Sequence, residues 1–127
     1  GQIASIGALD TPQSYFTEVR NEYIARRDYA ISRLNAMDGV YSPTPMGAFY
    51  TIARIPVDDA EKFAKWMLTD FRLDGQTTMV TPAKSFYKTP GFGGDQIRLA
   101  YVLGISELEK AFDALEAGLR EYPCRTI

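Results

Sequence analysis

Apolar residues recur at helical spacing between residues 12 and 37, near the start of the chain. The repeating positions are Phe16, Val19, Tyr23, Ala30 and Leu34. A long helix is predicted, because side chains three or four residues apart lie on one face of an α-helix. Thr11 followed by Pro12 is typical of a helix start, and Gly39 is typical of a helix end. Glu22 precedes Arg26 by four residues, a spacing that allows an ion pair worth about 0.3 kcal/mol.

Three short segments have the composition of β-strands. Residues 46–55 are rich in aromatic and β-branched side chains and lie between Pro45 and Pro56, which predicts the first strand. Residues 77–81 and 97–102 predict two more strands, and we expect Pro82 to end the first of these two. The proline and glycines of residues 90–94 predict a flexible turn between them.

Two further helices are predicted from capping signals and apolar stripes. Asp58 with Glu61, and later Ser106 with Glu109, resemble capping boxes at helix starts. The stripe of the middle helix is Phe63, Trp66, Met67 and Phe71, and that of the last helix is Leu108, Phe112, Leu115 and Leu119. The predicted fold class is therefore α/β of the α+β type, a small, mostly antiparallel sheet covered by helices in the order α-β-α-β-β-α.

Composition limits the classes of function. A chain of 127 residues with 46% hydrophobic and 24% charged residues is expected to form a single domain over residues 1–127. A formal net charge of -2 argues against nucleic acid as a partner. No apolar stretch reaches the ~20 residues needed to cross a bilayer, so no membrane association is expected. The single cysteine, Cys124, cannot form an internal disulfide, and we expect a cytoplasmic location.

The residues alone reveal no complete active site. The chain has no histidine, no cluster with metal-ligand spacing and no glycine motif between a strand and a helix. In the strand at residues 97–102, Ile97 and Leu99 point to one face and Arg98 points to the other. An arginine on that other face is usually solvated or paired with a neighbouring strand. The periodic positions of Tyr50, Trp66 and Phe112 predict that these side chains pack in the core. By periodicity, then, Arg98 is an ordinary surface residue.

Several strings in fixed order resemble the small domain of class I aminotransferases. Tyr41-x-Pro43-x-Pro45 followed by Met-Gly-Ala-Phe-Tyr at residues 46–50 is one string, and Ile-Arg-Leu-Ala-Tyr at residues 97–101 is another. Between them, residues 81–87 resemble the family's proline-led active-site loop. Before both strings, residues 23–28 resemble the family's helix segment with paired arginines. The match runs from Gln2 to about Tyr122 and departs from the family at residues 83 and 87, where many members have glycine.

The resemblance implies a function that composition does not show. The chain is similar to the C-terminal small domain of a fold-type I aminotransferase, whose cofactor is pyridoxal 5'-phosphate bound to a lysine of the large domain. Arg98 of the Ile-Arg-Leu string would bind the substrate α-carboxylate, and Phe86 would edge the substrate pocket. No catalytic, cofactor-binding or metal-binding residue is expected in this chain, which alone is predicted to be inactive. Expected partners are amino-acid and keto-acid substrates, the large domain of the same chain, and a second subunit in a homodimer. Residues 1–11 are expected to form the junction to the large domain.

The sequence is also compatible with two other functions. The order α-β-α-β-β-α also suits a free-standing module that senses a small molecule or binds a partner without catalysis. A regulator derived from an aminotransferase would keep the fold but lose the cofactor lysine. The sequence encoded upstream of Gly1 separates these alternatives, and the substrate amino acid stays undetermined.

Overall fold

The computed structural model describes residues 1–127 as a small sheet with helices packed against one face. Its elements are α1 (Gln2–Leu9), α2 (Gln13–Ala36), β1 (Tyr50–Arg54), α3 (Ala60–Thr69), β2 (Thr81–Pro82), the 3-10 helix η1 (Lys84–Phe86), β3 (Gln96–Ala100) and α4 (Ile105–Glu121). The expected α+β class with a small antiparallel sheet is confirmed. From α2 onward the elements follow the expected order, with η1 added between β2 and β3.

The sheet has the strand order β1-β3-β2, so β3 is the central strand. Both neighbours run antiparallel to it, and Arg98 of β3 lies opposite Ile52 of β1 and Thr81 of β2. Ile97 lies opposite Ala53 and Pro82. Since directly opposed residues point to the same face, these pairs define the two faces of the sheet.

One face of the sheet builds the core and the other stays open. Ala53 and Ile97 are fully buried in a single apolar cluster. The helical members of this cluster are Ala30 and Leu34 of α2, Ala60, Phe63 and Met67 of α3, and Leu108, Phe112, Ala114, Leu115 and Leu119 of α4. The face that carries Ile52 and Arg98 has only half-buried and exposed residues, because no helix covers it.

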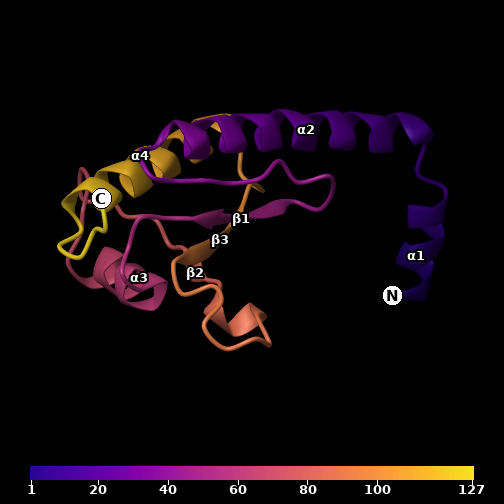
Figure 1. Ribbon diagram of the computed structural model, residues 1–127. Coiled ribbons are helices and arrows are strands. Elements are labelled where there is room, and N and C mark those ends of the chain that lie inside the picture. The colour runs from indigo at the N-terminus through magenta and orange to yellow at the C-terminus, as the bar shows by residue number, and fades with distance from the viewer.

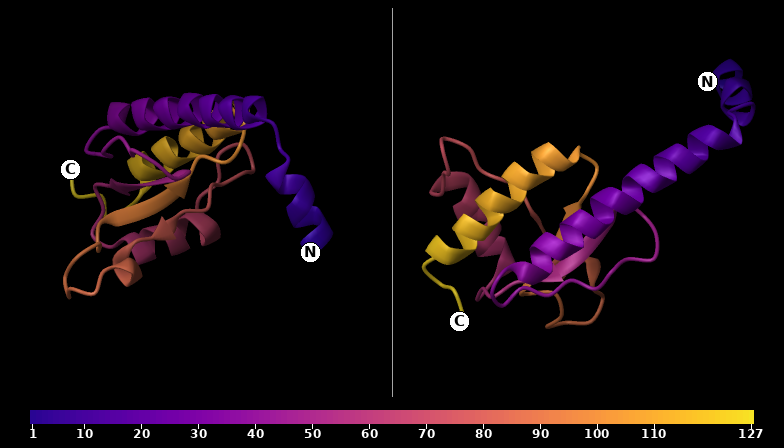
Figure 2. Two further views of the ribbon diagram at one scale, coloured as in Figure 1. Left: turned by 90° about the vertical axis from the view of Figure 1, so that its right-hand side faces the viewer. Right: turned by 90° about the horizontal axis from the view of Figure 1, so that it is seen from above.

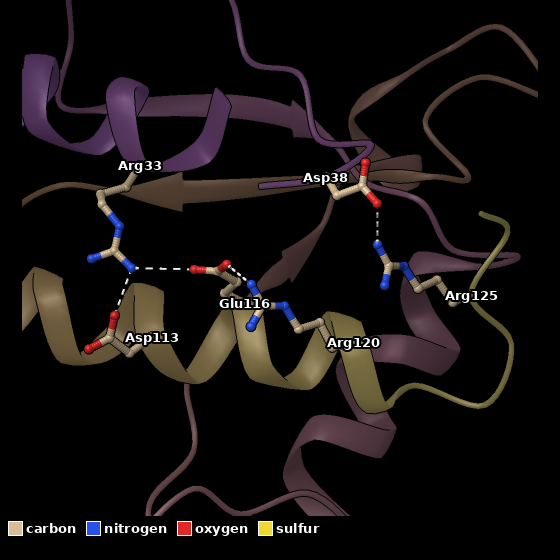
Figure 3. A network of polar contacts seen from close by, with 6 residues as sticks. All are labelled: Arg33, Asp38, Asp113, Glu116, Arg120 and Arg125. Atoms are coloured by element: carbon tan, nitrogen blue, oxygen red, sulfur yellow. Dashed lines mark hydrogen bonds and ion pairs between the residues drawn. The ribbon is translucent and has the colours of Figure 1, made fainter. Parts of the chain in front are cut away.

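Charged side chains join α2 to α4, which run side by side in the ribbon views (Figure 2). Arg33 of α2 donates to Asp113 of α4 at 2.6 Å and lies 3.6 Å from Glu116 (Figure 3). Glu116 also pairs with Arg120 one turn further along α4. This network crosses the two helices at their solvent edge, where exposed pairs contribute at most about 1 kcal/mol each.

The predicted helix starts are wrong in detail. At α3 the capping residue is Asp59, whose carboxylate accepts from the backbone N–H groups of Glu61 and Lys62 at 2.8 and 3.1 Å. Asp58 instead pairs with Lys62 at 3.0 Å. At α4 the N-cap residue is Gly104, with no side-chain cap, and Ser106 is already helical. The capping-box spacing therefore marks both helix starts only to within two residues.

Two strand predictions need correction. The first strand covers Tyr50–Arg54 rather than residues 46–55, because Ala48 has a positive φ of 63° that turns the chain out of the sheet. The strand predicted at residues 77–81 exists as β2 but is shifted to Thr81–Pro82, since the hydroxyl of Thr77 donates to the Met67 carbonyl at 2.7 Å and holds the start of this segment on α3. Pro82 does not end the strand but is part of β2, an edge strand where its missing N–H is tolerated.

A helix also forms where only a junction was expected. α1 has no buried residue and contains the exposed side chains of Ile3, Ile6 and Leu9. Figure 1 shows it at the far end of α2, away from the sheet. Packing against this domain therefore does not explain its apolar residues.

Candidate functional site

The candidate site lies on the open face of the sheet around Arg98. The expected alternation is confirmed, because Ile97 is fully buried while Arg98, next to it, is half-buried on the opposite face. Arg98 stands in the middle of the central strand, so the backbone that carries it is paired on both sides. A guanidinium mounted in this way has a well-defined starting point on a rigid element.

The guanidinium of Arg98 contacts aromatic rings and makes no hydrogen bond or ion pair within the chain. Its carbon Cζ lies 4.7 Å from the ring centre of Phe86 and 5.6 Å from that of Tyr50. Most other arginines of the chain donate to a carboxylate or a carbonyl, such as Arg33 to Asp113 and Arg54 to Asp95. Arg98 is thus a half-buried cation whose N–H donors all remain available.

The loop after β2 brings Phe86 to Arg98. The 3-10 helix η1 follows β2 directly and ends at Phe86, which is 49% exposed. Gly93 permits this arrangement, because it has a φ of +76° and an added Cβ would lie 2.6 Å from the ring of Tyr87 and 3.0 Å from Lys84 Cα. The Tyr87 hydroxyl donates to Gln96 Oε1 at 2.6 Å, which attaches the loop to β3. Phe86 and Arg98, both named from the sequence, are therefore neighbours in the structure.

Tyr50 reaches Arg98 from the other side of β3 and was missed by sequence reasoning. Its predicted place in the core is wrong, because it is 43% exposed on the open face at the start of β1. The preceding turn is fixed by two bonds from Tyr101, whose backbone N–H donates to Phe49 and whose hydroxyl donates to Ala48 at 2.9 and 3.2 Å. Burial raises the pKa of Tyr101, so this hydroxyl stays a donor. The register between β1 and β3 is the signal that identifies Tyr50, and a single sequence does not contain it.

A cavity of about 230 Å³ lies beside the candidate site, between the end of β3 and α4. Its lining includes Arg98, Met79, Leu103 and Phe112, and Arg98 is its only charged residue. No carboxylate or imidazole that could transfer a proton lines this space. The site can bind and orient an anion, but its own residues supply no acid or base.

Other kinds of site find little support in the described chain. No group of three or more histidine, cysteine, aspartate or glutamate residues is arranged to hold a metal ion. None of the helices has both the length and the apolar character needed to cross a membrane. The lysines are all exposed, and none lines the cavity beside Arg98; they are Lys62, Lys65, Lys84, Lys88 and Lys110.

Comparison with known proteins gives sequence and structural relatives of one kind, although no family model matches the chain. The chain is 33% identical over 124 residues to an aspartate aminotransferase of Pyrococcus abyssi, and 30% identical over 123 residues to one of Rhizobium meliloti. These matches cover 94% and 91% of this chain but only 30% and 29% of the relatives. The chain therefore spans about a third of the length of the curated relatives it matches.

Solved structures agree with these sequence matches. An alanine aminotransferase from Pyrococcus furiosus superimposes with a TM-score of 0.78 at 28% identity, and covers 94% of this chain with 29% of its own. An aromatic aminotransferase from Pyrococcus horikoshii gives a TM-score of 0.74 at 33% identity, covering 94% and 31%. The small sheet with its helices is thus one part of a larger known architecture.

Proposed function

Because this chain belongs to the fold-type I aminotransferases, in which it corresponds to the C-terminal part, we propose that it serves an enzyme that transfers an amino group between an amino acid and a 2-keto acid. Within that enzyme its task is to bind the α-carboxylate shared by both substrates. Arg98 is the residue that does so. In such an enzyme, the large domain would supply the groups that bind the cofactor and carry out the chemistry.

The observation that carries this proposal is the unpaired guanidinium of Arg98. A half-buried arginine normally has a carboxylate or carbonyl partner, because an uncompensated buried charge is costly. Arg98 has two aromatic neighbours instead and keeps its planar fork of donors free. Such a fork matches a carboxylate in a bidentate arrangement that the single ammonium of lysine does not reproduce.

Binding the carboxylate would orient the substrate rather than react with it. Two parallel N–H···O bonds fix the position and the plane of the carboxylate, and with them the bond from the carboxylate to the α-carbon. The rigid strand β3 holds the guanidinium in place while the amino group lies elsewhere in the cleft. Phe86, on the adjoining loop, lies against the guanidinium and would shield one side of the ion pair from water.

The cofactor of this enzyme would be pyridoxal 5'-phosphate, held outside this chain. When bound, pyridoxal phosphate supplies an aldehyde that takes up the amino group and a ring that withdraws electrons from the α-carbon. The residues described here do not fit its binding site, since every lysine is exposed and none adjoins Arg98. We therefore assign the cofactor lysine and the phosphate-binding groups to the large domain.

The open surfaces of the chain support a partner domain. α1 exposes Ile3, Ile6 and Leu9, with Ile3 and Leu9 each 87% exposed. Large apolar side chains gathered on one short helix usually mark an interaction surface. We propose that residues 1–11 join the large domain and that α1 packs against it, and that the complete enzyme is a homodimer.

The proposal is tested by replacing Arg98 in the full-length enzyme. Arg98→Ala should lower kcat/KM for an amino acid by about 2–5 kcal/mol, or about 30-fold to several thousand-fold, because a charged bidentate pair in a cleft is lost. Arg98→Lys should retain more activity than Arg98→Ala. The decarboxylated amine of the same substrate should react equally in all three proteins. Equal losses on the amine and the amino acid would make Arg98 a structural residue and refute the assignment.

A second experiment tests the proposed inactivity of the chain alone. The purified 127-residue chain is incubated with pyridoxal phosphate, reduced with borohydride and mapped by mass spectrometry. Labelling should be scattered and substoichiometric, because the lysines are all solvent-exposed and none has a phosphate-binding loop beside it. One stoichiometric lysine adduct, or turnover of any amino acid, would contradict the proposal.

A further inference from the structure

Two aromatic rings approach the Arg98 guanidinium from the two strands that flank β3. Tyr50 begins β1 on one side, and Phe86 ends η1, in the loop that follows β2, on the other. The guanidinium carbon lies over both rings, at 5.6 and 4.7 Å from their centres. The ring of Tyr50 also packs edge-on against Phe49, with the ring centres 5.8 Å apart.

We propose that Tyr50 is a positioning residue for Arg98, and that with Phe86 it holds the guanidinium in place without using its hydrogen-bond donors. The inference rests on the proposed carboxylate-binding function. It adds how the guanidinium is held in its binding position before a substrate binds. A carboxylate partner inside the protein would also fix the side chain, but it would compete with the substrate for the same fork. Aromatic faces attract the cation through their quadrupole and leave every N–H free.

The position of Tyr50 follows from the turn that precedes it. Ala48 adopts the left-handed conformation at φ 63°, and its carbonyl accepts from the hydroxyl of the buried Tyr101. β1 then starts at Tyr50, two residues before Ile52, which lies opposite Arg98. Tyr50 is therefore a diagonal neighbour of Arg98 on the open face, within reach of an aromatic side chain.

The ring of Tyr50, and not its hydroxyl, carries this role. The hydroxyl makes no hydrogen bond within the chain, whereas those of Tyr87, Tyr101 and Tyr122 each donate to a partner. Tyr50→Phe should therefore keep the restraint on Arg98, and Tyr50→Leu should remove it. Tyr41 provides a matched control, because it is an exposed tyrosine that does not contact Arg98.

The experiment compares these variants in the full-length enzyme. Tyr50→Leu should raise KM for the amino acid about 3- to 10-fold, as expected for one partly desolvated cation–π contact, with a smaller change in kcat. Tyr50→Phe should restore most of the affinity. Tyr41→Leu and the reaction of the decarboxylated amine should be unaffected. If Tyr50→Leu behaves like Tyr41→Leu, or if Tyr50→Phe loses as much as Tyr50→Leu, the proposal is overturned.

A double-variant cycle separates this inference from the proposed function. If Tyr50 acts through Arg98, Tyr50→Leu should cost nothing further in an Arg98→Ala background. The same loss in both backgrounds would show that Tyr50 acts on something else and would overturn the inference while leaving the role of Arg98 intact. An Arg98→Ala variant that impairs the amine as much as the amino acid would instead refute the proposed function itself.

A spectroscopic readout tests the contact without relying on turnover. The Nε–Hε resonance of Arg98, in ¹H–¹⁵N spectra of the full-length enzyme, should be displaced by the ring currents of its aromatic neighbours. Tyr50→Leu should move this resonance and broaden it, while Tyr41→Leu should not. An unchanged resonance in Tyr50→Leu would overturn the proposed contact, whatever the kinetic result.

Discussion

A tight approach between α3 and α4 predicts how the domain responds to a single added methyl group. Gly118 lies within α4, where a Cβ would stand 2.3 Å from Sδ and 3.0 Å from Cε of Met67 on α3. In an exposed helix Gly→Ala stabilises by up to about 1 kcal/mol. Here Met67 is completely buried, and inserting a methyl group into a packed core costs about 1–3 kcal/mol. Gly118→Ala should therefore destabilise the domain, by about 1 kcal/mol on balance.

Urea unfolding followed by circular dichroism measures this effect. A loss of about 1 kcal/mol with an m-value of about 1–3 kcal/mol per molar urea lowers the midpoint by about 0.3–1 M. In a Met67→Val background, which lacks the Sδ and Cε atoms, the same Gly118→Ala change should be neutral or stabilising. Gly7→Ala in α1 is a control without contacts, because nothing lies within 4 Å of its added Cβ. Stabilisation by Gly118→Ala, or equal losses in both Met67 backgrounds, would refute the packing argument.

Two further predictions concern a helix cap and a buried hydroxyl. Asp59→Ala should lower the free energy of unfolding by about 1 kcal/mol, measured by thermal or urea unfolding, because two N–H groups of α3 lose their acceptor. Ser106→Ala, inside α4, should change it by less than about 0.5 kcal/mol. Similar losses in the two variants would contradict the observed caps. Burial and the hydrogen bond to Asp58 raise the pKa of Tyr122, so above about pH 10 the unfolded chain releases this proton before the folded chain does, and stability should fall. Tyr122→Phe should lose less stability between about pH 9 and 11 than the unaltered chain, and a parallel decline in both would contradict this.

Periodicity in the sequence predicts the elements whose packing is local. The stripe of Leu108, Phe112, Leu115 and Leu119 is buried as expected, since each residue lies on the same face of α4. The ion pair between Glu22 and Arg26 also forms, at 2.8 Å. These features depend on spacing within one helix, which a single sequence contains in full.

Features set by distant parts of the chain were predicted less well. Asp58 and Asp59 are both plausible caps by residue type, but Asp59 caps α3 while Asp58 pairs with Lys62 and accepts from Tyr122, far along the chain, at 2.9 Å. Residues 77–81 have strand-like composition, but of these only Thr81 joins the sheet, because Thr77 bonds to α3.

The candidate site shows the same division. The alternating pattern places Arg98 on the face opposite the core, and the resemblance to the aminotransferases suggests what Arg98 binds there. The two rings beside Arg98 come from other elements, brought there by the pairing of β1 and β2 with β3. Phe86 was named from the family loop, whereas Tyr50 was assigned to the core from its periodic position and lies instead on the open face.

The most direct test of the role of Arg98 is a structure of the full-length enzyme with an amino-acid analogue bound. We expect two hydrogen bonds of about 2.7–2.9 Å from the Arg98 guanidinium to the two oxygens of the α-carboxylate. The rings of Tyr50 and Phe86 should remain beside the guanidinium, where they lie in the unliganded domain. A carboxylate held by other residues, with Arg98 directed into solvent, would contradict the central claim.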